Sequence, residues 1–160
     1  MTIYGILISI ITCFLLIKMR NDKKKYNIRL SECNNIIRKQ EEFYRLFTRW
    51  LNIHNHGISV ADYCTRNNFR CVAIYGMKEA GELLTTELEK NGIQVLYGID
   101  MDAEKIYAKT SIVKPSEELA DVDVIIVTAV HYFEQIEADL RSKVNCQIVS
   151  LLDMVYEIKL

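Results

Sequence analysis

The most constraining feature of the sequence is an uncharged apolar run at its amino end. From Ile3 to Ile17 it reads Ile-Tyr-Gly-Ile-Leu-Ile-Ser-Ile-Ile-Thr-Cys-Phe-Leu-Leu-Ile, and its Ser and Thr hydroxyls can hydrogen-bond back to helix carbonyls. As a helix, residues 1–17 span roughly 25 Å, slightly less than the ~30 Å hydrocarbon core of a bilayer. We expect residues 1–17 to form a transmembrane anchor. A cleaved signal peptide and a buried core helix are the alternatives.

Cations follow this apolar run instead of preceding it. Residues 18–29 carry six cations and one anion, a net charge of +5, and because the whole chain carries −1, the remainder carries −6. A signal peptide has its cations before its apolar run and small residues at its end, so this order favours a retained anchor. The positive-inside rule places the N-terminus outside and everything after Lys18 in the cytoplasm. We therefore expect a single-pass protein of the cell membrane, with a basic collar at residues 18–29 that attracts anionic lipids of the inner leaflet.

Composition limits the rest of the chain to one modest domain. Half of the residues are apolar and 26% are charged, so the chain can build a hydrophobic core. A length of 160 residues is too short for a two-domain dehydrogenase, a full barrel enzyme or a multi-span transporter. An acidic body beside a basic collar is a poor nucleic-acid binder, so no nucleic-acid partner is expected. The five cysteines form no Cys-x-x-Cys pair, and His54-Asn-His56 has no Cys or carboxylate at ligand spacing. We expect reduced thiols and no metal site.

A helical arm is predicted between the collar and the domain, at residues 30–56. Its apolar residues recur at helical spacing, and no proline or glycine interrupts them. They include Leu30, Cys33, Ile37, Tyr44, Phe47 and Leu51. Gln40 stands at a would-be seam position of a heptad pattern. The wide, aromatic-rich stripe favours packing onto the protein's own domain, with a homodimer contact and a nucleotide-binding role as the alternatives.

The remaining residues, 57–160, alternate between strand and helix patterns. Short apolar runs predict five strands, at residues 70–75, 93–99, 111–113, 123–128 and 146–151. Helices are predicted at residues 59–67 with Ser59 as cap, at 77–90, in a short acidic segment capped by Ser116, and at 132–142. Such alternation indicates an open, mostly parallel sheet with right-handed crossovers. The predicted fold class is α/β, a single Rossmann-like domain with strand order 3-2-1-4-5.

The segment after the first strand resembles a nucleotide-binding fingerprint. Gly76-Met-Lys-Glu-Ala-Gly81 opens a helix, and the second strand ends at Asp100, 24 residues after the first glycine. This is similar to the Gly-x-Gly-x-x-Gly fingerprint of Rossmann domains, whose glycines let the backbone approach a pyrophosphate and whose acid binds ribose hydroxyls. Gly76 and Gly81 match the first and third glycines. Lys78 stands at the second, where its ammonium could contact a phosphate at the helix amino terminus.

Within this group, three stretches look most like compact domains linked to bacterial surface-polysaccharide synthesis: Val-Ala-Ile-Tyr-Gly, Tyr-Gly-Ile-Asp and Val-Ile-Ile-Val-Thr-Ala. That family includes membrane-tethered enzymes that modify sugar nucleotides, and sugar acyltransferases. The resemblance covers roughly residues 70–151 and implies NAD(P) or a nucleotide-sugar as cofactor and a glycan-synthesis enzyme as partner. Topology places the pocket at the carboxyl ends of strands 1 and 4. Its expected residues are Gly76, Met77, Lys78, Glu79, Ala80, Gly81, Asp100, Thr128, Ala129 and His131.

No catalytic constellation is recognisable in the sequence. The Tyr-x-x-x-Lys pair of short-chain dehydrogenases is absent, and Ser111-Ile-Val-Lys114 has the spacing of certain acyl-enzymes but falls in a predicted strand instead of at a helix start. The preferred hypothesis is a membrane-tethered module that binds a nucleotide, nucleotide-sugar or related cofactor. A degenerate scaffold that recruits or regulates a glycan enzyme is the first alternative, and an NAD(P)-dependent enzyme the second. In a degenerate scaffold, Gly76, Gly81 and Asp100 would serve only turns, packing and capping, and His131 would only begin a helix.

Overall fold

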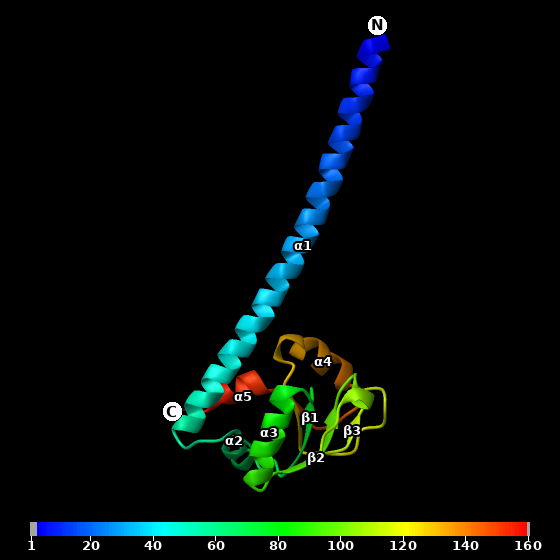
Figure 1. The fold of residues 1–160 in the computed structure, drawn as a ribbon. Coiled ribbons are helices and arrows are strands. Elements are labelled where there is room, and N and C mark those ends of the chain that lie inside the picture. Colours follow the sequence, from blue (N-terminus) through cyan, green and yellow to red (C-terminus); the bar gives the residue numbers. More distant parts are fainter. Residues whose placement is uncertain (1–2, 160) are drawn as a thin grey trace. The chain divides into compact units, whose positions relative to one another are not determined.

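The protein divides into two compact units, the first ending at Glu41 and the second beginning at Glu42. The structure is a computed structural model that describes residues 3–159. Met1 and Thr2 of the predicted anchor and Leu160 of the predicted domain lie outside the described residues. Helix α1 (Ile3–Asn55) begins in the first unit and ends in the second (Figure 1).

The first unit is the part of α1 that precedes Glu42. One 18-residue window of this helix is long and apolar enough to cross a membrane, and no part of that window is buried inside the protein. The lack of burial does not fit the alternative of a core helix. A signal sequence would pass the same test of length and composition. The helix is therefore a membrane-span candidate, as the sequence predicts.

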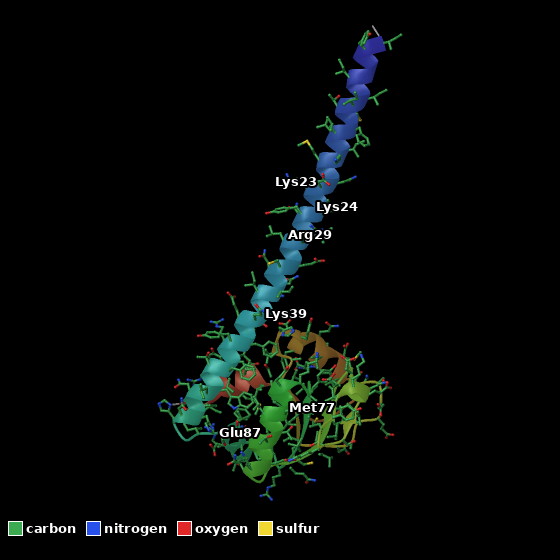
Figure 2. All side chains as sticks on the ribbon, viewed as in Figure 1. Lys23, Lys24, Arg29, Lys39, Met77 and Glu87 are labelled. Carbon is green, nitrogen blue, oxygen red and sulfur yellow. The ribbon has the colours of Figure 1, made fainter. Side chains whose placement is uncertain are left out.

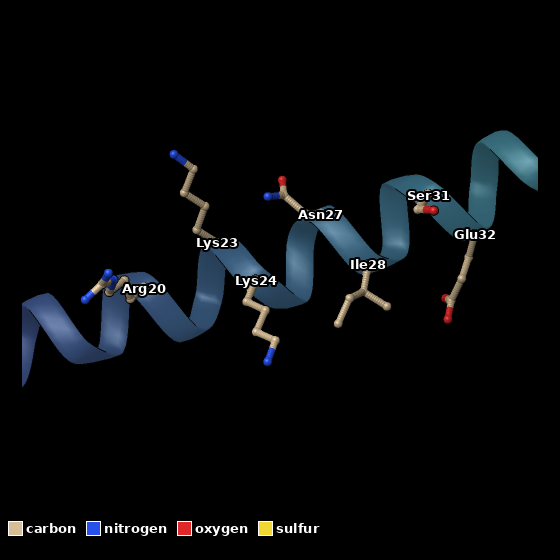
Figure 3. A pocket seen from close by; sticks show the side chains of 7 residues that line it. All are labelled: Arg20, Lys23, Lys24, Asn27, Ile28, Ser31 and Glu32. Carbon is tan, nitrogen blue, oxygen red and sulfur yellow. The ribbon is translucent and has the colours of Figure 1, made fainter.

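The basic collar continues the same helix. Its side chains are exposed, and Lys23 and Lys24 point to opposite sides of α1 (Figure 3). The apolar stripe of the arm follows, and its Leu30 and Ile37 side chains are also exposed. No second chain is present, so the homodimer contact along this stripe stays a prediction.

The second unit is built on a five-stranded, fully parallel sheet. The strands are β1 (Cys71–Tyr75), β2 (Gln94–Ile99), β3 (Ile112–Val113), β4 (Val124–Val127) and β5 (Gln147–Ser150). Their order is β3-β2-β1-β4-β5, which confirms the predicted topology and fold class. The central strands β1 and β4 are unbroken apolar runs because both of their faces are covered.

Helices cover the two faces of the sheet unequally. The helices are α2 (Val60–Arg66), α3 (Glu79–Lys90), α4 (Phe133–Leu140) and α5 (Leu151–Glu157), with 3₁₀ turns η1 (Ala103–Lys105) and η2 (Val130–Tyr132). One face packs in a core with the end of α1, α2, α3 and α5, through Val72, Ile74, Val124 and Ile126. The other packs with α4 and with the loop before β4, through Ala73, Ile125 and Val127. Side chains alternate between the two faces along β1 and β4, as the two-residue period of a strand requires. In β2 the alternation is interrupted between Val95 and Tyr97, where the pairing register with β1 shifts.

Local sequence signals explain several boundaries. The Ser59 hydroxyl accepts the Asp62 amide at 3.3 Å and the Asp62 carboxylate accepts the Ser59 amide at 2.7 Å, so a capping box starts α2 and confirms the predicted cap. Helix α5 follows β5 directly, with Ser150 as N-cap, and was not predicted.

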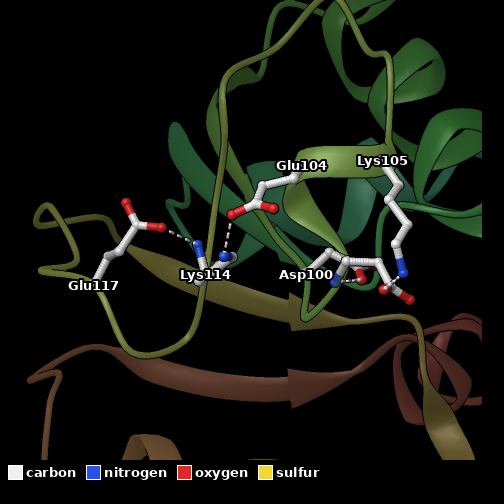
Figure 4. Close-up of polar contacts among 6 residues, drawn as sticks. Asp100, Glu104, Lys105, Lys114 and Glu117 are labelled. Carbon is white, nitrogen blue, oxygen red and sulfur yellow. Dashed lines mark hydrogen bonds and ion pairs between the residues drawn. The ribbon is translucent and has the colours of Figure 1, made fainter.

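The predicted acidic helix after Ser116 is wrong. The described chain between β3 and β4 contains no helix. Instead, the Glu117 amide donates to the Lys114 carbonyl at 3.0 Å and the Glu117 carboxylate accepts the Lys114 amide at 2.8 Å (Figure 4). This closes a turn around Pro115, and the side chain that the helix would have carried outward is used in the turn.

The last turns of α1 belong to the core of the second unit. Leu46 and Ile53 are fully buried, and Trp50 is 7% exposed. The Trp50 Nε1–H donates to one oxygen of Glu87, on α3, at 2.6 Å, and the other oxygen accepts the Val60 amide at 2.6 Å (Glu87 is labelled in Figure 2). One carboxylate thus joins the end of α1 to α2 and α3.

Arg49 makes a second attachment of α1. Its guanidinium donates to the carbonyls of Val155 at 3.0 Å and of Ile158 at 2.5 Å, at the end of α5 where helix carbonyls have no intrahelical donor. The sequence places the start of the domain at residue 57, whereas the second unit starts at Glu42. The difference arises because residues 42–55 bury large apolar side chains in the core.

We predict that Leu46→Ala lowers the free energy of unfolding of the second unit by about 2–5 kcal/mol, because the deleted atoms leave a cavity in a packed core. The matched control is Leu51→Ala on the same helix, where the side chain is 61% exposed and the expected change is within about 0.5 kcal/mol. Urea unfolding followed by the fluorescence of Trp50, the only tryptophan, measures both. Equal losses for the two variants would contradict the packing of α1.

Candidate functional site

A pocket of about 580 Å³ lies at the carboxyl ends of β1 and β4. The chain moves from β1 towards β2 on one side and from β4 towards β5 on the other, so this is the switch point of the sheet, where ligands of open α/β folds bind. The structure brings eight of the ten predicted site residues to this pocket: Gly76, Lys78, Glu79, Ala80, Asp100, Thr128, Ala129 and His131. Met77 and Gly81 do not line it.

Gly76 makes the tight turn after β1. Its φ of +93° is a conformation that residues with a side chain rarely adopt, and a Cβ there would lie 2.6 Å from Thr128 Oγ1. The Thr128 amide donates to the Tyr75 carbonyl at 2.9 Å. The Thr128 hydroxyl lies 2.6 Å from the Gly76 carbonyl oxygen and can donate to it. The end of β4 therefore holds the turn in place.

The two predicted residues outside the pocket shape this turn from behind. A Cβ on Gly81 would lie 2.3 Å from the Gly76 carbonyl oxygen, so only glycine lets α3 pack this close to the turn. The Met77 side chain is 1% exposed and packs against Gly98, where a Cβ would come within 2.4 Å of Met77 Cγ. Met77 thus points into the core and leaves the mouth of the turn open.

Asp100 fastens two loops with one carboxylate. The side chain is 8% exposed at the end of β2. One oxygen accepts the Met77 amide at 2.9 Å. The other accepts the Asp102 amide at 3.0 Å (Figure 4). A carboxylate oxygen offers about two acceptor sites, so each can also accept a ligand hydroxyl.

The amino terminus of α3 offers backbone donors to the pocket. The N-cap residue of this helix, Lys78, makes no side-chain capping hydrogen bond, and the amides of a first turn have no intrahelical acceptor. Lys78, Glu79 and Ala80 all line the pocket. However, Glu79 and Glu82 place two carboxylates in the first turn, where they already interact with the helix dipole.

An aromatic wall faces this turn. The ring of His131 lies 5.6 Å from that of Phe43, in an edge arrangement, and 4.1 Å from that of Tyr132. All three residues line the pocket. Phe43 comes from α1, more than thirty positions before Gly76, and no local signal in the sequence connects the two. Asp139 also lines the pocket and is not among the predicted site residues. Helical spacing could have indicated it, because Gln135, Ile136 and Asp139 share one face of α4.

Carboxylates set the charge around Tyr75, the last residue of β1. Burial, followed by the charges of Asp100 and Asp139, raises the pKa of the Tyr75 hydroxyl above its usual value. The exposed Asp102 carboxylate pairs with Lys105 at 2.8 Å, and this contact lowers the pKa of Asp102. The pocket therefore combines carboxylates that can accept hydrogen bonds, one lysine and aromatic side chains.

The architecture is Rossmann-like, a parallel sheet of five strands with helices on both faces. Comparison of the chain with models of protein families, with curated proteins and with solved structures gave no match.

We predict that Gly81→Ala destabilises the protein by about 1–3 kcal/mol, because the new Cβ meets the rigid Gly76 backbone. Alanine in place of glycine within a helix ordinarily stabilises by about 0.5–1 kcal/mol, so the expected sign is reversed. Trp50 fluorescence in urea gives the change, with Glu89→Ala at an exposed position of α3 as control. An increase in stability for Gly81→Ala would show that the turn does not depend on close packing.

Proposed function

We propose that this chain is a membrane-tethered module whose cytoplasmic domain binds a small ligand of nucleoside type at the switch-point pocket. The observation that carries the proposal is the convergence of the turn after β1, the acid after β2 and the end of β4 on one pocket of ligand size. In the Rossmann fingerprint these positions bind a nucleotide's phosphate and ribose. Nucleotides, nucleotide-sugars and NAD(P) belong to the ligands to be tested.

The role that fits this proposal is accessory to a membrane enzyme of surface-polysaccharide synthesis. Its support is the resemblance of the strand ends to such domains, together with the span candidate in α1. In this arrangement the α1 span holds the domain in the membrane with its N-terminus outside, and the basic collar contacts anionic lipid. The module would present its ligand to a partner enzyme at the inner leaflet.

One observation favours a second function, a scaffold that binds no ligand. The Met77 amide, which would meet a phosphate if the loop acted as in nucleotide-binding Rossmann domains, is already bonded to Asp100. The same contact would serve a scaffold by ordering the loop for a partner protein. A binding measurement distinguishes the two functions, because only the first requires a ligand in the pocket.

We predict that Ala129→Trp abolishes ligand binding, because Ala129 lines the pocket and a large side chain there fills it. The control is Ala138→Trp, an exposed position of α4 that does not line the pocket. The full-length protein in lipid nanodiscs is dialysed against labelled nucleosides, nucleotides, nucleotide-sugars and NAD(P).

For the unmodified protein, a ligand at 100 times its dissociation constant should also stabilise the domain by about 2.7 kcal/mol. Binding that survives Ala129→Trp would contradict this pocket as the site. Absence of binding by every compound would favour the scaffold.

We predict that removing residues 1–17 releases the protein from membranes. Residues 18–160 retain the collar, whose attraction to anionic vesicles is screened in 1 M salt, where the Debye length is about 3 Å. The full chain should stay with the vesicle pellet after such a wash, and the shortened chain should move to the supernatant. Equal retention of the two proteins would contradict the anchor.

A further inference from the structure

The pocket is lined by more carboxylates than cationic side chains. Four acidic side chains line it: Glu79, Asp100, Asp102 and Asp139. Among the lining residues that the structure describes, Lys78 is the only lysine or arginine. Lys105 pairs with Asp102 from outside the lining, at 2.8 Å. Three carboxylates then still face one ammonium, so the pocket repels additional negative charge.

The charges around Tyr75 also disfavour an anionic ligand. The half-buried Tyr75 lies at the end of β1 and lines the pocket together with Asp100 and Asp139. Burial, and then the charges of these two carboxylates, raise the pKa of its hydroxyl. Asp139 comes from α4 and Asp100 from the end of β2. Negative potential is therefore present on two sides of the pocket, from separate elements.

The backbone donors at α3 compensate only partly. The Met77 amide is bonded to Asp100 at 2.9 Å, and Glu79 and Glu82 oppose an anion at the helix start. What remains for a phosphate group is the Lys78 ammonium and the amides of the first turn.

We propose that the ligand is a nucleoside whose remaining substituent is uncharged or cationic instead of a diphosphate, an inference that rests on the proposed function. The wall of Phe43, His131 and Tyr132 offers a surface on which a base can stack. The Asp100 oxygens retain acceptor sites for ribose hydroxyls. A cationic substituent then meets the Asp139 carboxylate and the faces of the aromatic rings.

Probes that share one nucleoside and differ in the substituent at its 5′ position, from cationic to doubly phosphorylated, test this inference. Full-length protein in phosphatidylcholine nanodiscs is dialysed against 5′-amino-5′-deoxyadenosine, adenosine, AMP and ADP, and against the corresponding uridine series. We expect the amine to bind at least as tightly as the nucleoside, and ADP to bind at least tenfold more weakly. Tightest binding by ADP or UDP would overturn the inference while leaving the proposed function intact. Absence of binding by both series would overturn both.

Asp139→Asn provides the matched variant. Both Asp139 and the control residue Asp121 are exposed, and only Asp139 lines the pocket, so neither change is expected to unfold the protein. Asp139→Asn should weaken binding of the amine by about 2–5-fold, the range of a solvent-exposed ion pair, and should strengthen binding of ADP. Asp121→Asn should change neither. An unchanged ratio of amine to ADP affinity in Asp139→Asn would contradict the assigned role of this carboxylate.

Discussion

The site depends on one carboxylate that bonds to two loops. Asp100 accepts the amide of Met77, in the turn after β1, and that of Asp102, in the turn after β2. Hydrogen bonds to a charged acceptor contribute about 1.5–3 kcal/mol each, more than neutral ones. Because parallel strands end at the same edge of the sheet, this contact fixes the shape of the pocket at that edge. It also occupies the Met77 amide, so at the proposed ligand site the same interaction would both shape the pocket and leave one donor fewer for a phosphate.

The end of α1 completes the hydrophobic core of the domain. The sheet face formed by β1 and β4 is apolar and needs a cover. Leu46, Trp50 and Ile53 supply part of it, and the Glu87 carboxylate fixes their helix to α2 and α3 through hydrogen bonds. The same stretch of α1 carries Phe43 to the pocket wall. Residues at the end of α1 thus take part directly in both the core of the domain and the lining of its pocket.

The sequence predicted what local chemistry determines and missed what long-range contacts determine. The strands were predictable because buried parallel strands are short apolar runs, and their order followed from the strand–helix alternation of a Rossmann-like sheet. Gly76 was recognisable because a tight turn needs its positive φ. The helix after Ser116 was mispredicted because the Glu117 side chain bonds to its own turn. Phe43 and the start of the second unit at Glu42 could not be predicted, since an apolar stripe does not reveal which of its turns the domain buries.

Hydrogen exchange at two amides tests the role of Asp100 most directly. Asparagine keeps the shape of Asp100 but lacks its charge and offers only one oxygen, so Asp100→Asn cannot hold both amides equally. The account predicts that Met77 or Asp102, or both, exchange at least about tenfold faster in this variant, while amides inside β1 and β4 keep their rates. Unchanged exchange at Met77 and Asp102 would contradict the account, because it would show that the two loops are ordered without the carboxylate.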